Sequence, residues 1–150
     1  MNKSPRSIDK ELAEKLTAAL TAEAEPLFQI VLDTDLKVPL AALRNPAITE
    51  KHLLALLKRQ DLTEEIPERI FNRHKKYLSR PLLLSLVKNP ATSDVIFRTL
   101  VSHLYLFELV DFCYLPRISS DRKMAAERCI LQQLPTTPLD NKITLARRAP

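Results

Sequence analysis

The chain has 150 residues, 45% of them hydrophobic and 27% charged, with a formal net charge of +5. It has no glycine, whereas an average chain of this length has roughly ten. Because glycine supplies tight phosphate-binding and catalytic turns, this composition excludes the dinucleotide-binding fingerprint, the P-loop and the nucleophile elbow of hydrolases. The length and hydrophobic content predict one domain with a real core.

The ends and the cysteines favour a cytoplasmic protein. The segment from Met1 to Leu16 is too charged for a signal peptide. The most apolar run, 104–115, is far shorter than the ~20 residues that span a bilayer. Cys113 and Cys129 have no C-x-x-C spacing, so we expect reduced, buried thiols. We therefore expect no membrane association and no cofactor.

Helical periodicity begins near the N-terminus. Ser7 or Asp9 can cap a first helix, and a dense apolar segment follows from about Pro26 to Leu32. The face of the first helix consists of Ile8, Leu12, Leu16, Ala19 and Leu20. We interpret residues 1–36 as an N-terminal helical hairpin that caps the rest.

Residues 38–134 are built from one recurring unit, a helix, a proline corner and a second helix with a capping side chain. Proline disfavours the helical conformation of the residue before it, and Thr or Ser three residues later can cap the next helix. The corner residues are Asn45, Pro46 and Thr49, then Asn89, Pro90 and Ser93, then Pro116 and Ser119, where the asparagine is missing. The three prolines are 44 and 26 residues apart, so the repeats are irregular.

Further helices are predicted between and after the corners. One runs from about Glu64 to Leu78, and a last one from about Ser120 to Leu134. The stretch from Asp94 to Leu115 predicts two helices joined near Ser102, and the second is expected to be the most buried. Residues 135–150 begin a further repeat or fray. Since no segment alternates convincingly at period two, the sequence predicts an all-α fold of seven to nine helices in antiparallel pairs.

The corners resemble those of known repeat proteins. Leu43-Arg44-Asn45-Pro46, Val87-Lys88-Asn89-Pro90 and Tyr114-Leu115-Pro116 are similar to corners of bacterial α-solenoids, of the HEAT-like and leucine-rich-repeat-variant groups. The resemblance covers about residues 38–134 and implies an irregular HEAT-like α-solenoid that binds partners on an extended concave surface. The cysteine cluster of some leucine-rich repeat variants is missing, so no iron–sulfur site is implied.

A basic cluster is the main candidate for a binding site. Its members are Arg73, Lys75, Lys76 and Arg80, and Lys88, Arg122 and Lys123 could extend it. One interpretation is a stripe that contacts phosphates. The other is a solvated outer face, since cations near helix C-termini also complement the helix dipole. Aromatic residues make up only 5% of the chain, which gives little support to binding by base stacking.

The histidines and carboxylates give weak indications of chemistry. His52, His74 and His103 lack metal-ligand spacing, and His103 is expected to be a hydrogen-bonded core residue. Glu64, Glu65 and Glu68 cluster where a helix begins, and its dipole explains them. Glu108 and Asp111 interrupt the most apolar helix. They are either a buried ion pair or ligand-facing acids, or the polar edge of that helix.

These observations predict a protein that is not an enzyme. The expected function is a non-catalytic protein–protein interaction scaffold or adaptor in the bacterial cytoplasm, whose basic side chains select an acidic surface on another protein. The alternative is an α-solenoid that binds nucleic acid and contacts its phosphate backbone through a basic face. Salt discriminates between them, because phosphate binding weakens steeply as salt rises.

Overall fold

The computed structural model describes residues 5–134, and this part of the chain is all-helical, with nine α-helices, one 3-10 helix and no strand. The all-α prediction is therefore confirmed for these residues. The elements are α1 (Pro5–Thr21), α2 (Ala24–Ile30), α3 (Lys37–Ala42), α4 (Glu50–Leu57), α5 (Glu65–His74), η1 (Lys75–Tyr77), α6 (Arg80–Lys88), α7 (Asp94–Val101), α8 (Leu106–Cys113) and α9 (Ser120–Gln133).

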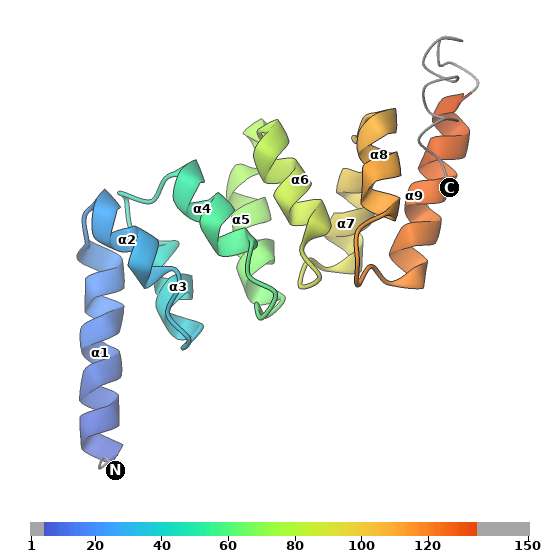
Figure 1. Cartoon of the computed structure of the whole chain (residues 1–150). Helices are drawn as coiled ribbons and strands as arrows, with labels where there is room; N and C mark the ends of the chain where they lie inside the picture. Colours follow the sequence, from blue (N-terminus) through green and yellow to red (C-terminus); the bar gives the residue numbers. More distant parts are fainter. Residues whose placement is uncertain (1–4, 135–150) are drawn as a thin grey trace.

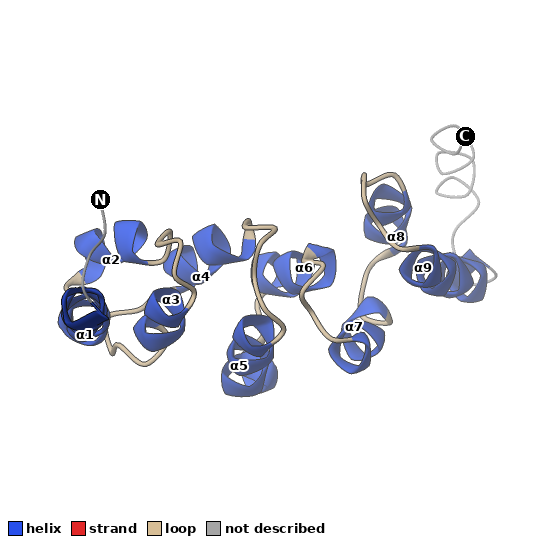
Figure 2. Ribbon diagram, turned by 90° about the horizontal axis from the view of Figure 1, so that it is seen from below, coloured by secondary structure: helices blue, strands red, loops and turns tan. Residues whose placement is uncertain are grey.

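The helices lie in two rows along an elongated molecule. Figure 2 shows α2, α4, α6 and α8 in one row and α1, α3, α5 and α7 in the other, with α9 beside α8 at one end. In Figure 1, α1 and α9 stand at opposite ends, and the chain progresses steadily between them. The most extensive contacts join α8 to α9, α1 to α3 and α4 to α6, so each helix packs on near neighbours in the sequence.

One continuous core lies between the two rows. Leu27, Leu56, Leu86 and Leu109, from α2, α4, α6 and α8, each have 0% of their surface exposed. Burying each such side chain contributes about 1.5–3 kcal/mol. The expectation that α8 is the most buried helix is wrong, since α4, α6, α7 and α8 each bury four side chains. In an extended two-row arrangement no helix is central.

Most predicted boundaries agree with the structure to within a few residues. The stretch from 94 to 115 contains two helices, α7 and α8, as expected. The helix predicted to reach Leu78 ends at His74, where the 3-10 turn η1 replaces it. The prediction for residues 135–150 lies outside the described residues. None of the helices within residues 5–134 is long and apolar enough to cross a bilayer.

The helices end without the left-handed residue that terminates roughly a third to a half of helices, since Arg117, in the corner before α9, is the one residue with a positive φ within residues 5–134. The residues after α2, α3, α4, α7 and α8, which are Val31, Leu43, Lys58, Ser102 and Tyr114, all keep right-handed helical angles. A chain with no glycine has few residues that accept a positive φ cheaply. The last carbonyl groups of each helix therefore need other hydrogen-bond donors.

Candidate partner-binding groove and the side chains that cap the helices

The two predicted corner asparagines cap helices of a neighbouring unit. Asn89 follows α6 and is 1% exposed. Its amide donates to the carbonyl oxygens of Leu57 and Arg59, at 2.9 and 3.0 Å, where α4 ends. Its own oxygen accepts a hydrogen bond of 2.9 Å from the backbone N–H of Ala91 and so shapes the corner. Asn89 thus joins the end of α6 to the end of α4.

Asn45, which follows α3 in the other row of helices, makes the same kind of contacts. Its amide donates to the carbonyls of Ala19 and Ala22, each at 2.9 Å, at the end of α1. Its oxygen accepts from the N–H of Ala47 at 2.8 Å. In both cases the corner asparagine reaches the end of the preceding helix in its own row, which is α1 for Asn45 and α4 for Asn89. The third corner has no asparagine, and there Arg117 adopts a φ of 64°, the one positive φ in residues 5–134.

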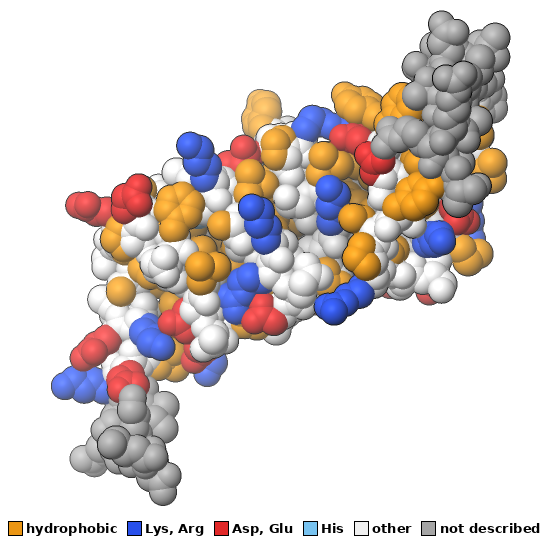
Figure 3. Space-filling model, in the orientation of Figure 1, with side chains coloured by type: hydrophobic (Ala, Val, Ile, Leu, Met, Phe, Trp, Pro, Cys, Tyr) orange, Lys and Arg blue, Asp and Glu red, His pale blue; other side chains and the backbone are white. Residues whose placement is uncertain are grey.

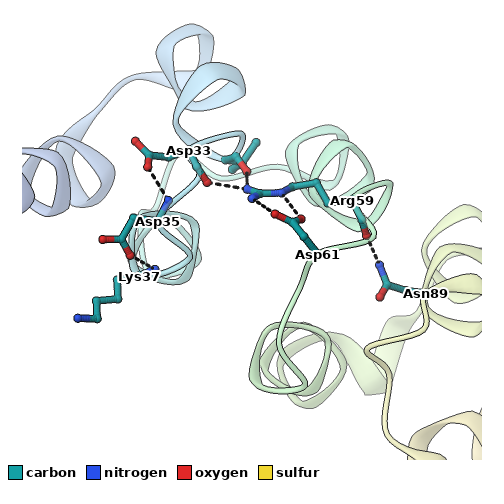
Figure 4. Close-up of polar contacts among 7 residues, drawn as sticks. Asp33, Asp35, Lys37, Arg59, Asp61 and Asn89 are labelled. Carbon is teal, nitrogen blue, oxygen red and sulfur yellow. Dashed lines mark hydrogen bonds and ion pairs between the residues drawn. The ribbon is translucent and has the colours of Figure 1, made fainter.

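Arg59 has a similar capping role at the end of α2, as Figure 4 shows. Its guanidinium donates to the carbonyls of Val31 and Asp33, at 2.9 and 2.8 Å. It also forms an ion pair of 2.7 Å with Asp61, and this hydrogen bond lowers the pKa of the Asp61 carboxyl below its ordinary value. The carbonyl of Arg59 in turn accepts from Asn89. The ends of α2, α4 and α6 are therefore connected in series.

The arginines of the predicted binding cluster cap helix ends as well. Arg73 donates to the carbonyl of Leu43 at the end of α3. Arg80 donates to the carbonyl of His103 at 3.1 Å, and its guanidinium lies 4.0 Å from the centre of the Tyr105 ring. Arg73 and Arg80, two members of the cluster, therefore have a structural role in the fold.

Arg122 is the most enclosed of the predicted contact residues. Its side chain is 13% exposed, and it donates to the carbonyls of Asn89 and Thr92 at the second corner. Its guanidinium also lies 4.9 Å from the centre of the Phe97 ring. The remaining members, Lys75, Lys76, Lys88 and Lys123, are exposed and form no ion pair with the described residues. The structure thus separates the predicted cluster into three capping arginines and four exposed lysines.

The carboxylates singled out in the sequence lie at helix ends. Glu108 forms an ion pair with Arg80 and accepts a 2.8 Å hydrogen bond from the N–H of Tyr105, where α8 begins. Asp111 is exposed, which agrees with the polar-edge interpretation for that residue. Glu65 pairs with Arg69 at 2.9 Å on the first turns of α5. Within residues 9–134 no three metal-ligating side chains come together.

The buried histidine is His52, so the prediction for His103 is wrong. His103 lies in the loop between α7 and α8 and is exposed, because α7 already ends at Val101. His52 is 1% exposed and accepts a 2.9 Å hydrogen bond from the N–H of Thr49 through Nδ1. Its Nε2 donates to the carbonyl of Ala24 at 2.7 Å. The signal in the sequence was the spacing of Thr49 and His52, which places a polar side chain three residues after a capping residue.

The cysteines are half-buried rather than buried. Cys113 on α8 and Cys129 on α9 are free thiols. Burial raises the pKa of both, and Glu127 adds to the effect at Cys113. Both groups therefore favour the neutral thiol, which is a poor nucleophile and metal ligand.

The largest described hollow lies where the ends of α4 and α6 meet the third corner. We call it the corner groove, and its volume is about 660 Å³. Its lining consists of apolar Leu57, Leu115, Pro116 and Ile118, uncharged Gln60 and Ser85, and cationic Lys58, Lys88 and Arg117. In Figure 1, α4 and α6 both end toward the lower edge of the molecule, where the chain between α8 and α9 also passes.

The corner groove has cations and no acids. None of its nine lining residues is acidic, and within residues 5–134 none of its three cations forms an ion pair. A second hollow of about 350 Å³ shares Lys88 and Arg117 and adds Asp94, Asp121 and Arg122. There Arg122 lies 3.5 Å from Asp94, which offsets part of the negative charge. The groove itself therefore favours a negatively charged ligand with an apolar part.

Comparison of the chain with protein-family models, with curated proteins and with solved structures finds no match.

Proposed function

We propose that this protein is a non-catalytic protein-interaction scaffold, built as an irregular HEAT-like α-solenoid of antiparallel helical pairs and working in the cytoplasm. The two-row arrangement supports the solenoid, because every helix packs on near neighbours in the sequence. The corner asparagines give further support. Asn45 and Asn89 make the same kind of contact in the two rows, since each joins the end of its own helix to the end of the preceding helix in that row.

The structural use of the polar residues supports a non-catalytic role. General acid–base catalysis needs a side chain within reach of a substrate in a cleft. Glu108 instead pairs with Arg80 at the start of α8, and His52 is enclosed between Thr49 and Ala24. Both side chains use their hydrogen-bonding groups to join neighbouring helices.

The observation that carries the proposal is the charge of the corner groove. An exposed hollow with three cations, several apolar side chains and no acid favours an acidic surface on another protein.

The nucleic-acid alternative has less support. The guanidinium groups of Arg73, Arg80 and Arg122 already donate hydrogen bonds to backbone carbonyl groups at helix ends or corners. On the face seen in Figure 3, Lys and Arg side chains stand apart, with hydrophobic and uncharged surface between them.

Two measurements test the proposal together. Fluorescence anisotropy with labelled duplex DNA and RNA, at low and near-physiological salt, should show no tight binding. A benzophenone crosslinker placed in turn at exposed positions of both rows should give position-dependent adducts with a protein from the source cells. Unlabelled chain should compete with these adducts. Salt-sensitive DNA or RNA binding that falls when Lys75 and Lys76 are neutralised, without protein adducts, would favour the nucleic-acid alternative.

A further inference from the structure

We propose that the corner groove binds a short acidic segment of the partner protein, with an apolar side chain on the groove floor and carboxylates on Lys58, Lys88 and Arg117. This inference rests on the proposed function and names the occupant of that same site. The chemistry required is a peptide in which Glu or Asp residues flank a Leu-like residue.

The shape of the groove suits a peptide segment. A volume of about 660 Å³ lies within the range of pockets that hold small ligands, about 300–1,000 Å³. Leu115 and Ile118 are only partly buried, so their apolar surface is available. Covering it would remove apolar area from water and favour binding. An acidic surface without an apolar residue would leave the apolar surface of Leu115 and Ile118 exposed to solvent.

The three cations come from three separate parts of the chain. Lys58 follows the last residue of α4, Lys88 is the last residue of α6, and Arg117 lies in the corner between α8 and α9. All three are exposed. Their convergence on one hollow depends on the stacking of the units, since 59 positions separate Lys58 from Arg117 (117 − 58). Asp94 and Asp121 line the adjoining hollow and are not part of the lining of the corner groove.

The backbone of Arg117 is an independent indication. A φ of 64° places it in the left-handed region, which is unfavourable for residues with a Cβ atom and far easier for Gly or Asn. The sequence nevertheless has arginine there, directly beside the groove. Such backbone strain concentrates at ligand-binding positions. We infer that the side chain of Arg117 is kept for its contact with the ligand.

The lining argues for a peptide rather than a nucleic acid. Proteins that bind single strands combine cations with aromatic side chains on which bases stack. The corner groove contains no aromatic residue. Its apolar residues match aliphatic side chains, and its cations match carboxylates.

The test is a titration of the full chain with a fluorescein-labelled hexapeptide, Glu-Leu-Glu-Glu-Leu-Glu, followed by anisotropy. The groove variant carries Lys58→Gln, Lys88→Gln and Arg117→Asn, since Asn tolerates the left-handed conformation. The matched control carries Lys51→Gln, Lys75→Gln and Lys76→Gln, which are exposed positions outside the groove lining. Both variants lose three positive charges, so the change in net charge is the same. Thermal unfolding followed by circular dichroism establishes that both remain folded.

We expect the wild-type chain to bind the peptide and the groove variant to bind about tenfold more weakly, because each exposed ion pair changes Kd by about 1.5- to 5-fold. The control should stay within about twofold of wild type. An all-Glu hexapeptide should bind at least about tenfold more weakly than the Leu-containing one, since it lacks the buried apolar side chain.

Four results would overturn the inference. Equal loss of binding in both variants would mean that only net charge matters. Equal binding of the all-Glu peptide, or displacement of the peptide by an equal concentration of oligothymidine, would mean that the groove accepts any polyanion. Absence of peptide binding would remove the inference, and the crosslinking scan then decides the proposed function separately. Protein adducts would leave the scaffold standing with a different partner surface, and their absence would remove both.

Discussion

The side-chain amide of Asn89 donates a 2.9 Å hydrogen bond to the carbonyl oxygen of Leu57, although 32 positions separate the two residues. Asn89→Ala would leave this carbonyl, the carbonyl of Arg59 and the N–H of Ala91 without their partner. Each buried group left unsatisfied costs roughly 1–3 kcal/mol. We expect the free energy of unfolding to fall by about 2–3 kcal/mol, measured by urea unfolding.

The matched control is Asn72→Ala. Asn72 lies on α5 and is exposed, and its side chain makes no hydrogen bond with the described residues. Its replacement should change the free energy of unfolding by no more than about 0.5 kcal/mol. Equal destabilisation by both substitutions would show that the contacts of Asn89 across the units add nothing to stability.

A second prediction concerns the guanidinium of Arg59. It reaches the carbonyls of Val31 and Asp33 and pairs with Asp61, which requires several N–H donors in a fixed planar arrangement. In Arg59→Lys the ammonium keeps the charge but cannot reproduce this geometry. We expect a loss of about 1–2 kcal/mol, because hydrogen bonds from a charged donor contribute about 1.5–3 kcal/mol each and lysine retains some of them.

Arg69→Lys provides the comparison for Arg59→Lys. Arg69 pairs with Glu65 on the exposed face of α5, and both side chains are about half exposed, at 54% and 52%. Exposed pairs of this kind contribute about 0.3–0.5 kcal/mol. A larger loss in Arg69→Lys than in Arg59→Lys, each measured by urea unfolding, would contradict the capping role of Arg59.

The local features of the fold could be predicted from the sequence because they depend on neighbouring residues. Proline at 46, 90 and 116 marked the corners, and Ser93 and Ser119 cap α7 and α9 as expected, each accepting a hydrogen bond from the backbone N–H three residues later. Both signals act within a few positions. The periodicity of leucines located the helices for the same reason.

The contacts between units could not be predicted in this way. From the sequence alone, Arg73, Arg80 and Arg122 were interpreted as part of a basic stripe. In the structure each donates a hydrogen bond to a carbonyl oxygen at a corner or helix end more than 20 positions away. The identity of the buried histidine was missed for a related reason. His103 fell in an apolar stretch but lies in a loop, whereas His52 is buried by its contact with Ala24 on α2. The partners of these arginines and the burial of His52 depend on how the helices pack, which the spacing of residues in the sequence does not show.

His74 predicts a dependence of stability on pH. Burial and the nearby charge of Arg73 lower its pKa below the ordinary value of 6.5, although Glu50 acts in the opposite direction. The unfolded chain therefore binds a proton at higher pH than the folded chain does. The stabilisation from neutral His74 is present above about pH 6.5 and is lost as the pH falls through that value to the lower folded pKa.

The check is urea unfolding of the wild type and of His74→Gln between pH 7.5 and about pH 5. Other groups titrate in both proteins, so the difference between them isolates His74. The wild type should lose more stability on acidification than the variant. A wild type that loses less than His74→Gln would show that the folded state favours the charged imidazole.

The two cysteines predict slow modification of the folded protein. Burial raises the pKa of Cys113 and Cys129 above 9.0, so the reactive thiolate is scarcer in the folded chain than in the unfolded chain. We expect alkylation by iodoacetamide at pH 8 to be at least severalfold slower in the folded protein than in urea. Peptide mass spectrometry would follow each site separately. Folded-state alkylation as fast as that in urea would contradict the assignment of both as half-buried neutral thiols.

Arg117 predicts a gain in stability when it is replaced. Its φ of 64° costs roughly 1–2 kcal/mol for a residue with a Cβ atom, and glycine adopts this conformation freely. Arg117→Gly also gives the unfolded chain more freedom, which offsets part of the gain. We expect the free energy of unfolding to rise by about 0.5–1 kcal/mol, measured in urea.

The control is Arg98→Gly, within the right-handed α7, which should lower the free energy of unfolding by about 1 kcal/mol. A loss of stability in Arg117→Gly as large as that in Arg98→Gly would show that the arginine side chain stabilises the corner. The strain would then have a structural cause, and the argument that this arginine is kept for a ligand would fail.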